Sequence, residues 1–289
     1  MTKKTSNNTQ SLKIPKIIVL SSKLIAYIST KLVTLYVAKL FTTPIKHKIP
    51  KRELEMNSKS KKFSVHIPKI NTKVILYQYG ESDKKILLVH GWSGRGTQLF
   101  KIADELIKEG YSIVSFDAPA HVKSPGKSTI MSEFVETILE VERQFGPFEA
   151  AVGHSLGGMS LLNAVKKGLA LNHLAIIGSG DIVTDILKDF VAKLELKPII
   201  SNQLRLYFEK KYEIEMDNYS GYKSAMDISI PVLVIHDKND LEVPASASIN
   251  IQKHLKNGEL FLTAGLGHRK ILGNHLVIEK VINFIKTEN

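Results

Sequence analysis

The sequence contains no cysteine, so disulfide bonds are excluded and no thiolate is available as a metal ligand. Its histidines never fall at the spacing typical of metal ligands, and we therefore expect no metal site. No uninterrupted apolar run approaches the ~20 residues that a membrane-spanning helix needs. These absences leave a chain of 289 residues with ordinary apolar content, enough for one large domain with an additional segment.

Excess charge is missing from most of the chain. The full sequence carries 40 basic and 28 acidic side chains, which gives a formal net charge of +12. Residues 1–62 hold 14 Lys or Arg and only two acids, so this segment alone carries +12, and residues 63–289 are neutral. A basic catalytic cleft for acidic substrates is therefore not indicated, whereas a basic N-terminal tail is.

The N-terminal segment contains an apolar-rich stretch over residues 13–41, in which lysines recur seven or eight residues apart (Lys16, Lys23, Lys31, Lys39). On a helix this spacing places the lysines in one stripe, which predicts an amphipathic helix. Three alternatives stay open: a helix lying in a membrane interface, a helix that packs on the main domain or lids it, and a spanning helix with snorkelling lysines. A signal peptide fits poorly, because the stretch is too long and contains lysines. Nucleic acid is not an expected partner, because the segment contains no motif that recognises nucleic-acid bases.

A motif with catalytic character occupies residues 153–158, Gly-His-Ser-Leu-Gly-Gly. An apolar run predicted as a strand precedes it, and a helical pattern over 159–165 follows it. Strand, G-x-S-x-G and helix form the setting of a nucleophile elbow, in which the serine sits on a sharp turn between small neighbours. Ser155 is then the candidate nucleophile, and the N–H of Leu156, at a helix N-terminus, can stabilise an oxyanion.

A nucleophilic serine also needs a base, an acid that orients the base and a second oxyanion donor. Asp240 follows a predicted buried strand over residues 231–236, and His268 follows another over 260–263. Trp92 follows a predicted strand over 85–89, where its backbone N–H can be the second donor. Asp237 and Asp181 remain rivals for the acid, because each also follows a predicted strand.

Several pieces together resemble the α/β-hydrolase superfamily over about residues 63–289: His90-Gly91-Trp92-Ser93-Gly94, Phe116-Asp117-Ala118-Pro119-Ala120-His121, the Ser155 motif, Asp240 ahead of Val243-Pro244, and Gly267-His268. The resemblance implies that Ser155 is the nucleophile, His268 the general base and acid, and Asp240 the orienting acid, with no cofactor. The superfamily's loop after the second of these strands usually reads Asp-x-Pro-Gly-His-Gly-x-Ser. Here Ala120 and Val122 stand where that loop has glycines.

The order of predicted elements agrees with this resemblance. An alternating pair of strands at 63–67 and 73–79 precedes a β-α-β alternation from Ile86 onward, which predicts a doubly wound, mostly parallel sheet. Helical patterns at 182–194 and 203–212, without an intervening strand, predict a short cap over about 182–226. Apolar cap residues such as Phe190 and Leu194 either line the acyl side of a pocket or form the cap's own core. We thus expect a tail, helix and linker at 1–62 and an α/β-hydrolase domain at 63–289.

These features predict a serine hydrolase that cleaves carboxylic esters through an acyl-enzyme, acting on small-molecule, hydrophobic or lipid-like esters. A thioesterase or acyltransferase with the same triad is an alternative, and so is a membrane-tethered binding module without catalysis. Arg95, directly after the oxyanion loop, binds an anionic substrate group or pairs with an acid; His154 is a further candidate for substrate contact. We expect a cytoplasmic protein with peripheral membrane contact through residues 13–41.

Overall fold

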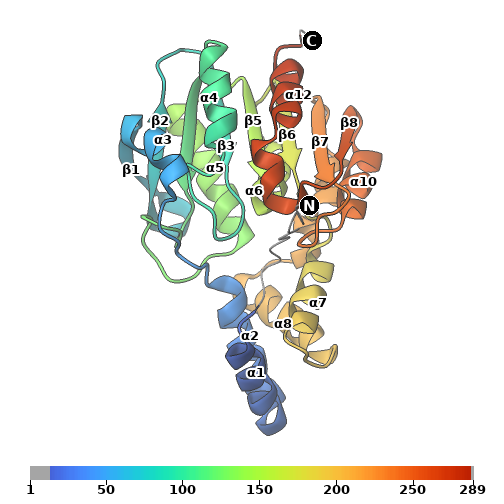
Figure 1. The fold of residues 1–289 in the computed structure, drawn as a ribbon. Helices are drawn as coiled ribbons and strands as arrows, with labels where there is room; N and C mark the ends of the chain where they lie inside the picture. The colour runs from blue at the N-terminus through green and yellow to red at the C-terminus, as the bar shows by residue number, and fades with distance from the viewer. Residues whose placement is uncertain (1–13, 288–289) are drawn as a thin grey trace, which may run out of the picture.

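The computed structural model of the protein describes residues 14–287 and places an eight-stranded sheet at its centre (Figure 1). The strand order is β1-β2-β4-β3-β5-β6-β7-β8. Strands β1 and β2 run antiparallel to their neighbours, and every pairing from β4 to β8 is parallel. The strands are β1 (Lys61–Ile67), β2 (Thr72–Tyr79), β3 (Lys85–Val89), β4 (Ser112–Asp117), β5 (Ala150–His154), β6 (His173–Ile177), β7 (Val232–Asp237) and β8 (Gly258–Thr263).

Helices cover both faces of the sheet, because the central strands are apolar on both sides. In β7, Val232 and Val234 face one core while Leu233 and Ile235 face the other, as the two-residue period of a strand requires. The first face is covered by α5 (Met131–Phe145), α6 (Leu156–Lys166), α9 (Gly221–Ala225) and α10 (Ala245–His254). The second is covered by α3 (Leu54–Lys59), α4 (Phe100–Lys108) and α12 (His275–Ile285). The predicted doubly wound sheet is confirmed.

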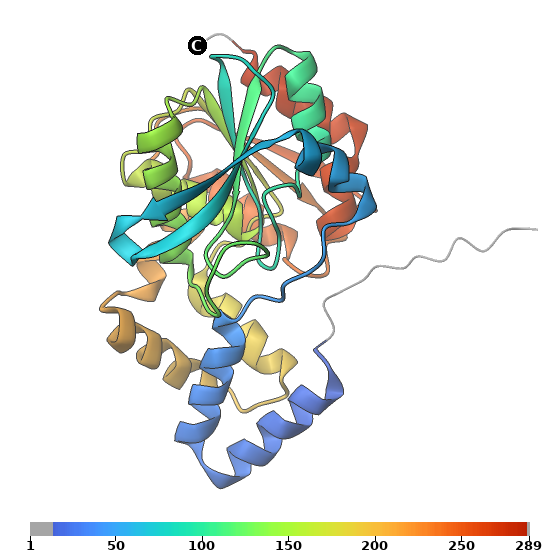
Figure 2. The same cartoon turned by 90° about the vertical axis from the view of Figure 1, so that its left-hand side faces the viewer.

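The cap lies between β6 and β7 and consists of α7 (Val183–Lys193), α8 (Ile199–Tyr212) and the short η3 (Met216–Tyr219), with α9 leading back to the sheet. Two N-terminal helices, α1 (Lys16–Ile28) and α2 (Thr30–Thr42), pack against it (Figure 2). Val33 and Val37 of α2 share a core with Leu187 of α7 and Leu204 of α8. Phe190 and Leu194 belong to this core as well, so they stabilise the cap itself.

The N-terminal segment differs from the predicted single helix. Ser29 is extended (φ −160°, ψ 127°), and its hydroxyl accepts a hydrogen bond from Leu32 N–H, so it ends α1 and caps α2. The break allows both helices to fold against the cap as a hairpin. None of the helices within residues 14–287 is both long enough and apolar enough to cross a membrane. The first 12 residues, whose polar composition predicts disorder, lie outside the described part of the chain.

Residues 43–60 are not a plain linker as predicted, because η1 (Lys51–Glu53) and α3 lie within them. Met56 of α3 is buried in the second core, and β1 begins at Lys61. The remaining short elements are η2 (Pro68–Ile70), α11 (Gly267–Lys270) and η4 (Ile271–Gly273). The N-terminal segment is therefore joined to the sheet through α3 as well as to the cap through the hairpin.

Candidate active site

Ser155 occupies a strained turn between β5 and α6. Its backbone angles are φ 53° and ψ −121°, a combination that L-residues adopt only where the surrounding structure enforces it. The turn brings α6 so close to β3 that a Cβ on Gly157 would lie 2.4 Å from the carbonyl oxygen of Val89. Only glycine fits there, which explains the small residue at this place in the motif. The side chain of Ser155 is half-buried at the carboxyl end of the central strands.

The loop after β3 lies directly against this turn. A Cβ on Gly91 would lie 2.9 Å from the Ser155 Cβ, so the backbone of the loop packs directly against the serine and leaves no room for a side chain at position 91. Trp92 follows Gly91 on this loop, and Leu156 begins α6 directly after Ser155. Both residues predicted to supply oxyanion donors therefore lie on the two segments that meet at Ser155.

Two buried histidines hold the loop in this position. His90 accepts a hydrogen bond from Ala118 N–H at its Nε2 (3.0 Å), and His121 accepts one from Ser93 N–H at its Nε2 (3.1 Å). Burial lowers the pKa of His121 to about 4 and that of His90 well below its usual range. Both imidazoles are therefore neutral at physiological pH, and they fix loop geometry.

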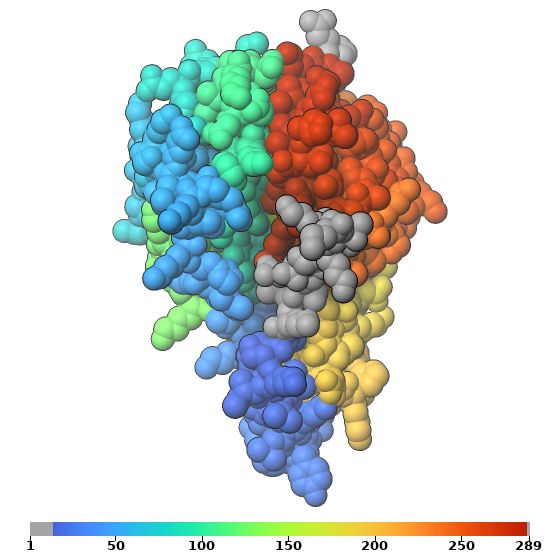
Figure 3. Space-filling model, viewed as in Figure 1, coloured from blue at the N-terminus to red at the C-terminus, as the bar shows by residue number. Residues whose placement is uncertain are grey.

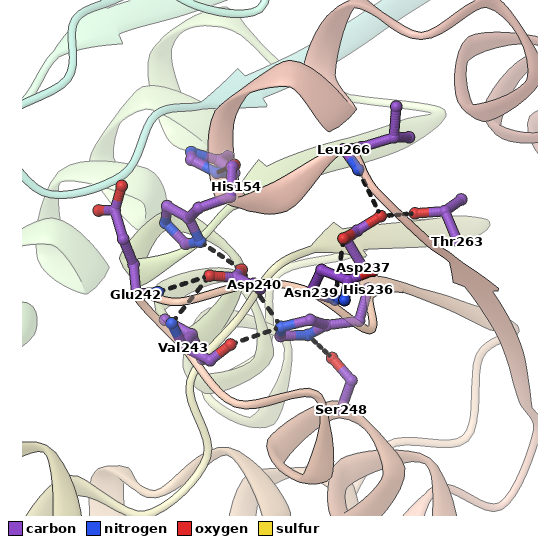
Figure 4. A network of polar contacts seen from close by, with 11 residues as sticks. His154, His236, Asp237, Asn239, Asp240, Glu242, Val243, Ser248, Thr263 and Leu266 are labelled. Carbon is purple, nitrogen blue, oxygen red and sulfur yellow. Dashed lines mark hydrogen bonds and ion pairs between the residues drawn. The ribbon is translucent and has the colours of Figure 1, made fainter. Parts of the chain in front are cut away.

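Asp240 and His268 meet although 28 residues separate them. His268 Nδ1–H donates to Asp240 Oδ2 at 2.7 Å. The backbone N–H groups of Glu242 and Val243 donate to Asp240 Oδ1 at 2.8 and 3.0 Å (Figure 4). Burial alone would raise the pKa of Asp240, but hydrogen bonds from His236 and His268 outweigh it, and the pKa lies well below its usual range. The carboxylate is thus ionised and holds one imidazole tautomer.

The two rival acids have other partners. Asp237 accepts hydrogen bonds from Asn239 N–H, Leu266 N–H and the Thr263 hydroxyl, and so ties together the loops after β7 and β8 (Figure 4). Asp181 accepts from Tyr222 N–H and the Asn250 amide in the cap region. Among the three candidate acids, the structure places Asp240 against His268.

His154 is hydrogen-bonded to the backbone of His268. Its Nε2–H donates to the backbone carbonyl of His268 at 2.9 Å, and its side chain is only 2% exposed. Burial and the neighbouring His268 lower the pKa of His154 to about 3, so it is neutral. The prediction that His154 contacts substrate is corrected, since its ring is covered and positions the His268 loop instead. Within residues 14–287, the Ser155 hydroxyl makes no hydrogen bond to His268, a contact that often tightens only with substrate bound.

Arg95 pairs with Glu53, and no local sequence pattern connects these two residues. Its guanidinium donates two hydrogen bonds to Glu53 at 2.5 and 2.6 Å, and the Thr97 hydroxyl donates to the same carboxylate at 2.8 Å. The side chains of Arg95 and Glu53 are only 10% and 1% exposed. Of the two roles expected for Arg95, the structure shows the pairing with an acid and not the binding of an anionic substrate group, because the guanidinium is occupied in a buried ion pair. Through this pair the N-terminal segment holds the loop after β3.

We expect Glu53→Gln to lower the free energy of unfolding by about 3–5 kcal/mol, because it leaves the buried Arg95 charge without a counter-ion. Glu55→Gln is a matched control, since it removes the same charge only two residues along the chain. Glu55 forms an exposed ion pair with Lys59, and the two side chains are 70% and 62% exposed. That control should leave the free energy of unfolding close to the wild-type value, because solvent screens an exposed ion pair. Urea denaturation of both variants measures the difference, and equal losses would contradict a special role for the buried pair.

The two residues that replace loop glycines keep the glycine conformation. Ala120 and Val122 have φ of 63° and 34°, in the left-handed region that is unfavourable for residues with a Cβ. For a β-branched residue such as Val122 this is an outlier. The loop is held there by its contacts: Ala120 N–H donates to Pro125 O, and the backbone of Lys123 donates to Asp117. Ala120 and Val122 thus leave the backbone conformation of this loop unchanged, at the cost of backbone strain beside the site.

Comparison with known proteins agrees with this geometry. A family model described as "Alpha/beta hydrolase family" matches residues 86–210, which include the loop after β3, the Ser155 turn, α7 and α8 except its last two residues. The chain has the α/β-hydrolase fold, and residues 86–210 match that family in sequence. The match ends before Asp240 and His268, so their pairing comes from the structure. No curated protein sequence matches the chain.

Solved structures share the fold of this hydrolase at low sequence identity. The Pyrococcus furiosus esterase Pf2001 has a TM-score of 0.64 at 19% identity, covering 85% of this chain and 98% of its own. A putative lipase from Acinetobacter baumannii AYE has a TM-score of 0.62 at 18% identity, covering 83% and 97%. A structure titled as a membrane phospholipase A has a TM-score of 0.62 at 16% identity, covering 94% and 98%. Since residues 63–289 are only about 79% of the chain, that last match extends into the N-terminal segment.

Proposed function

We propose that the protein is a serine hydrolase that cleaves carboxylic esters through an acyl-enzyme on Ser155. The observation that carries the proposal is the 2.7 Å hydrogen bond between His268 Nδ1 and the ionised Asp240, on a loop beside the strained Ser155 turn. Acyl transfer requires a nucleophilic serine, an imidazole held in one tautomer and two N–H donors. The candidate donors are the backbone N–H groups of Trp92 and Leu156.

The reaction follows from the placement of these groups. In the neutral imidazole, an Nδ1–H bound to Asp240 leaves the Nε2 of His268 free to accept the Ser155 proton as the hydroxyl attacks the ester carbonyl. The tetrahedral oxyanion then accepts hydrogen bonds from the N–H groups of Trp92 and Leu156, each worth roughly 3–4 kcal/mol in comparable sites. The imidazolium protonates the leaving alcohol, and the same nitrogen next activates water to release the acid.

Hydrophobic esters fit the proposal best. The part of the chain around the site carries no net positive charge, and the only arginine of the oxyanion loop is occupied by Glu53. Esterase, lipase and phospholipase titles among the structural neighbours support an ester bond as the target. A thioester or an acyl acceptor other than water remains compatible with the same groups.

The test is a set of matched substrates given to the full chain. Nitrophenyl esters of increasing acyl length, the corresponding thioesters and a phosphatidylcholine substrate are compared by kcat/KM, alongside labelling with a fluorophosphonate probe. We expect labelling and hydrolysis of esters at rates above those of thioesters. Labelling with faster thioester cleavage would reassign the substrate class, and a folded protein that neither labels nor turns over any substrate would overturn the proposal.

A further inference from the structure

Helix α1 is apolar on two faces, but the protein covers only one of them. Ile18, Ile25 and Ala26 pack toward the core that the hairpin shares with the cap. The opposite face consists of large exposed side chains at helical spacing, continuing across Ser29 onto α2, with exposed fractions of 65% for Leu20, 65% for Leu24, 92% for Tyr27, 68% for Ile28 and 52% for Leu32. We call these five residues the apolar tip. A helix that is apolar all round normally has both faces covered.

The apolar tip belongs to the part of the molecule that projects farthest from the sheet. The hairpin extends below the hydrolase domain in both ribbon views, and the space-filling view shows it as a protrusion (Figures 1, 2 and 3). A protruding apolar patch can enter a flat surface without a clash from the rest of the protein. Exposed apolar clusters of this kind mark interaction sites rather than ordinary surface.

The segment that carries the apolar tip is basic. Residues 14–52 contain eight Lys or Arg and no acid at all. Three acids of the neighbouring cap helices, Asp185, Asp189 and Glu209, each pair with a basic residue on their own helix. Glu195, after α7, pairs with Lys23 of α1 itself. An apolar centre with a basic surround is complementary to a bilayer with anionic head groups.

From this combination we propose that the apolar tip docks the protein on the surface of an anionic lipid bilayer, with the tip side chains in the interface and the surrounding lysines at the head groups. The hairpin is joined to the active-site loops: Thr129 N–H donates to Thr42 O, Ile45 N–H to Ser93 Oγ and Lys46 Nζ to Ser124 O. Docking therefore holds the site near the lipid surface. The proposal does not depend on the reaction at Ser155.

The experiment is co-sedimentation of the full chain with vesicles of phosphatidylcholine, with and without phosphatidylglycerol. The wild type should bind the anionic vesicles, and added salt should weaken binding because it screens the lysines. Tyr27→Asp and Leu24→Asp should each weaken binding at least about tenfold, since each places a charge where the proposed docking inserts an apolar side chain into the bilayer. Both residues are exposed, so the variants should fold as the wild type does.

Leu276→Asp is the matched control, because Leu276 is a 54% exposed leucine on α12, whose apolar residues pack on the sheet. It should bind vesicles like the wild type. Hydrolysis of a soluble nitrophenyl ester should be equal in all variants, which separates docking from catalysis. The proposal is overturned if the wild type does not bind anionic vesicles, or if Tyr27→Asp and Leu276→Asp bind them equally. It is also overturned if the tip forms a dimer that Tyr27→Asp dissociates and the protein does not bind vesicles.

Discussion

Replacing Ser155 with alanine should lower turnover on the order of 10⁶-fold, to the level left by substrate binding and the oxyanion donors alone. The hydroxyl is the only group at the turn that can form the acyl-enzyme, so no neighbouring side chain can take over its role. The backbone should keep its conformation, because alanine meets the same strain at φ 53° as serine does. Steady-state kinetics and fluorophosphonate labelling of Ser155→Ala measure the loss.

Ser160→Ala provides the control for this result. Ser160 lies on the same helix, α6, and its hydroxyl donates to Leu156 O at 2.8 Å rather than facing the site. It should retain labelling and activity. The melting temperature of Ser155→Ala should remain within a few degrees of the wild type. If Ser155→Ala unfolds, or if it keeps its label, Ser155 is not the nucleophile.

Asp240→Asn should lower turnover about 10⁴-fold, by analogy with other triads, because asparagine stabilises the imidazole tautomer of His268 that cannot act as a base toward Ser155. The N–H groups of Glu242 and Val243 already donate to Oδ1, so the amide oxygen of the asparagine will occupy that position. Its NH₂ group then faces His268 Nδ1 and donates to it. The proton of the imidazole moves to Nε2, which can no longer accept the Ser155 proton.

Asp181→Asn tests the assignment of the acid, because Asp181 was a rival that the structure places against Tyr222 and Asn250. This control should leave kcat near the wild-type value. Near-normal activity of Asp240→Asn together with a large loss in Asp181→Asn would move the role to the other acid.

The depressed pKa of Asp240 also gives the sign of a stability effect. A carboxyl whose pKa is lower in the folded state than the ~3.9 of the unfolded chain stabilises the protein fully above that value and loses this contribution as the pH falls further. Wild type should therefore exceed Asp240→Asn in free energy of unfolding at neutral pH, and the gap should narrow below about pH 4.

The sequence by itself determined the features that depend on local pattern. The strand-turn-helix context of Ser155 follows from apolar runs and glycines within about a dozen residues, and the alternation of strands and helices fixes a parallel sheet. In a parallel sheet the carboxyl ends of the strands share one edge, so the residues after β3, β5, β7 and β8 had to meet there. Ser155, Asp240, His268 and Trp92 could thus be nominated before the structure was known.

Only the tertiary structure decided which distant groups pair. Glu53 and Arg95 are 42 residues apart, and no local pattern links an acid in a short helix to an arginine in a loop. The N-terminal apolar stretch allowed a membrane helix or a packed one. The structure breaks it at Ser29 and buries one face against the cap while leaving the other exposed. The physical reason is the same in both cases: burial and ion pairing depend on partners that the chain brings together only when it folds.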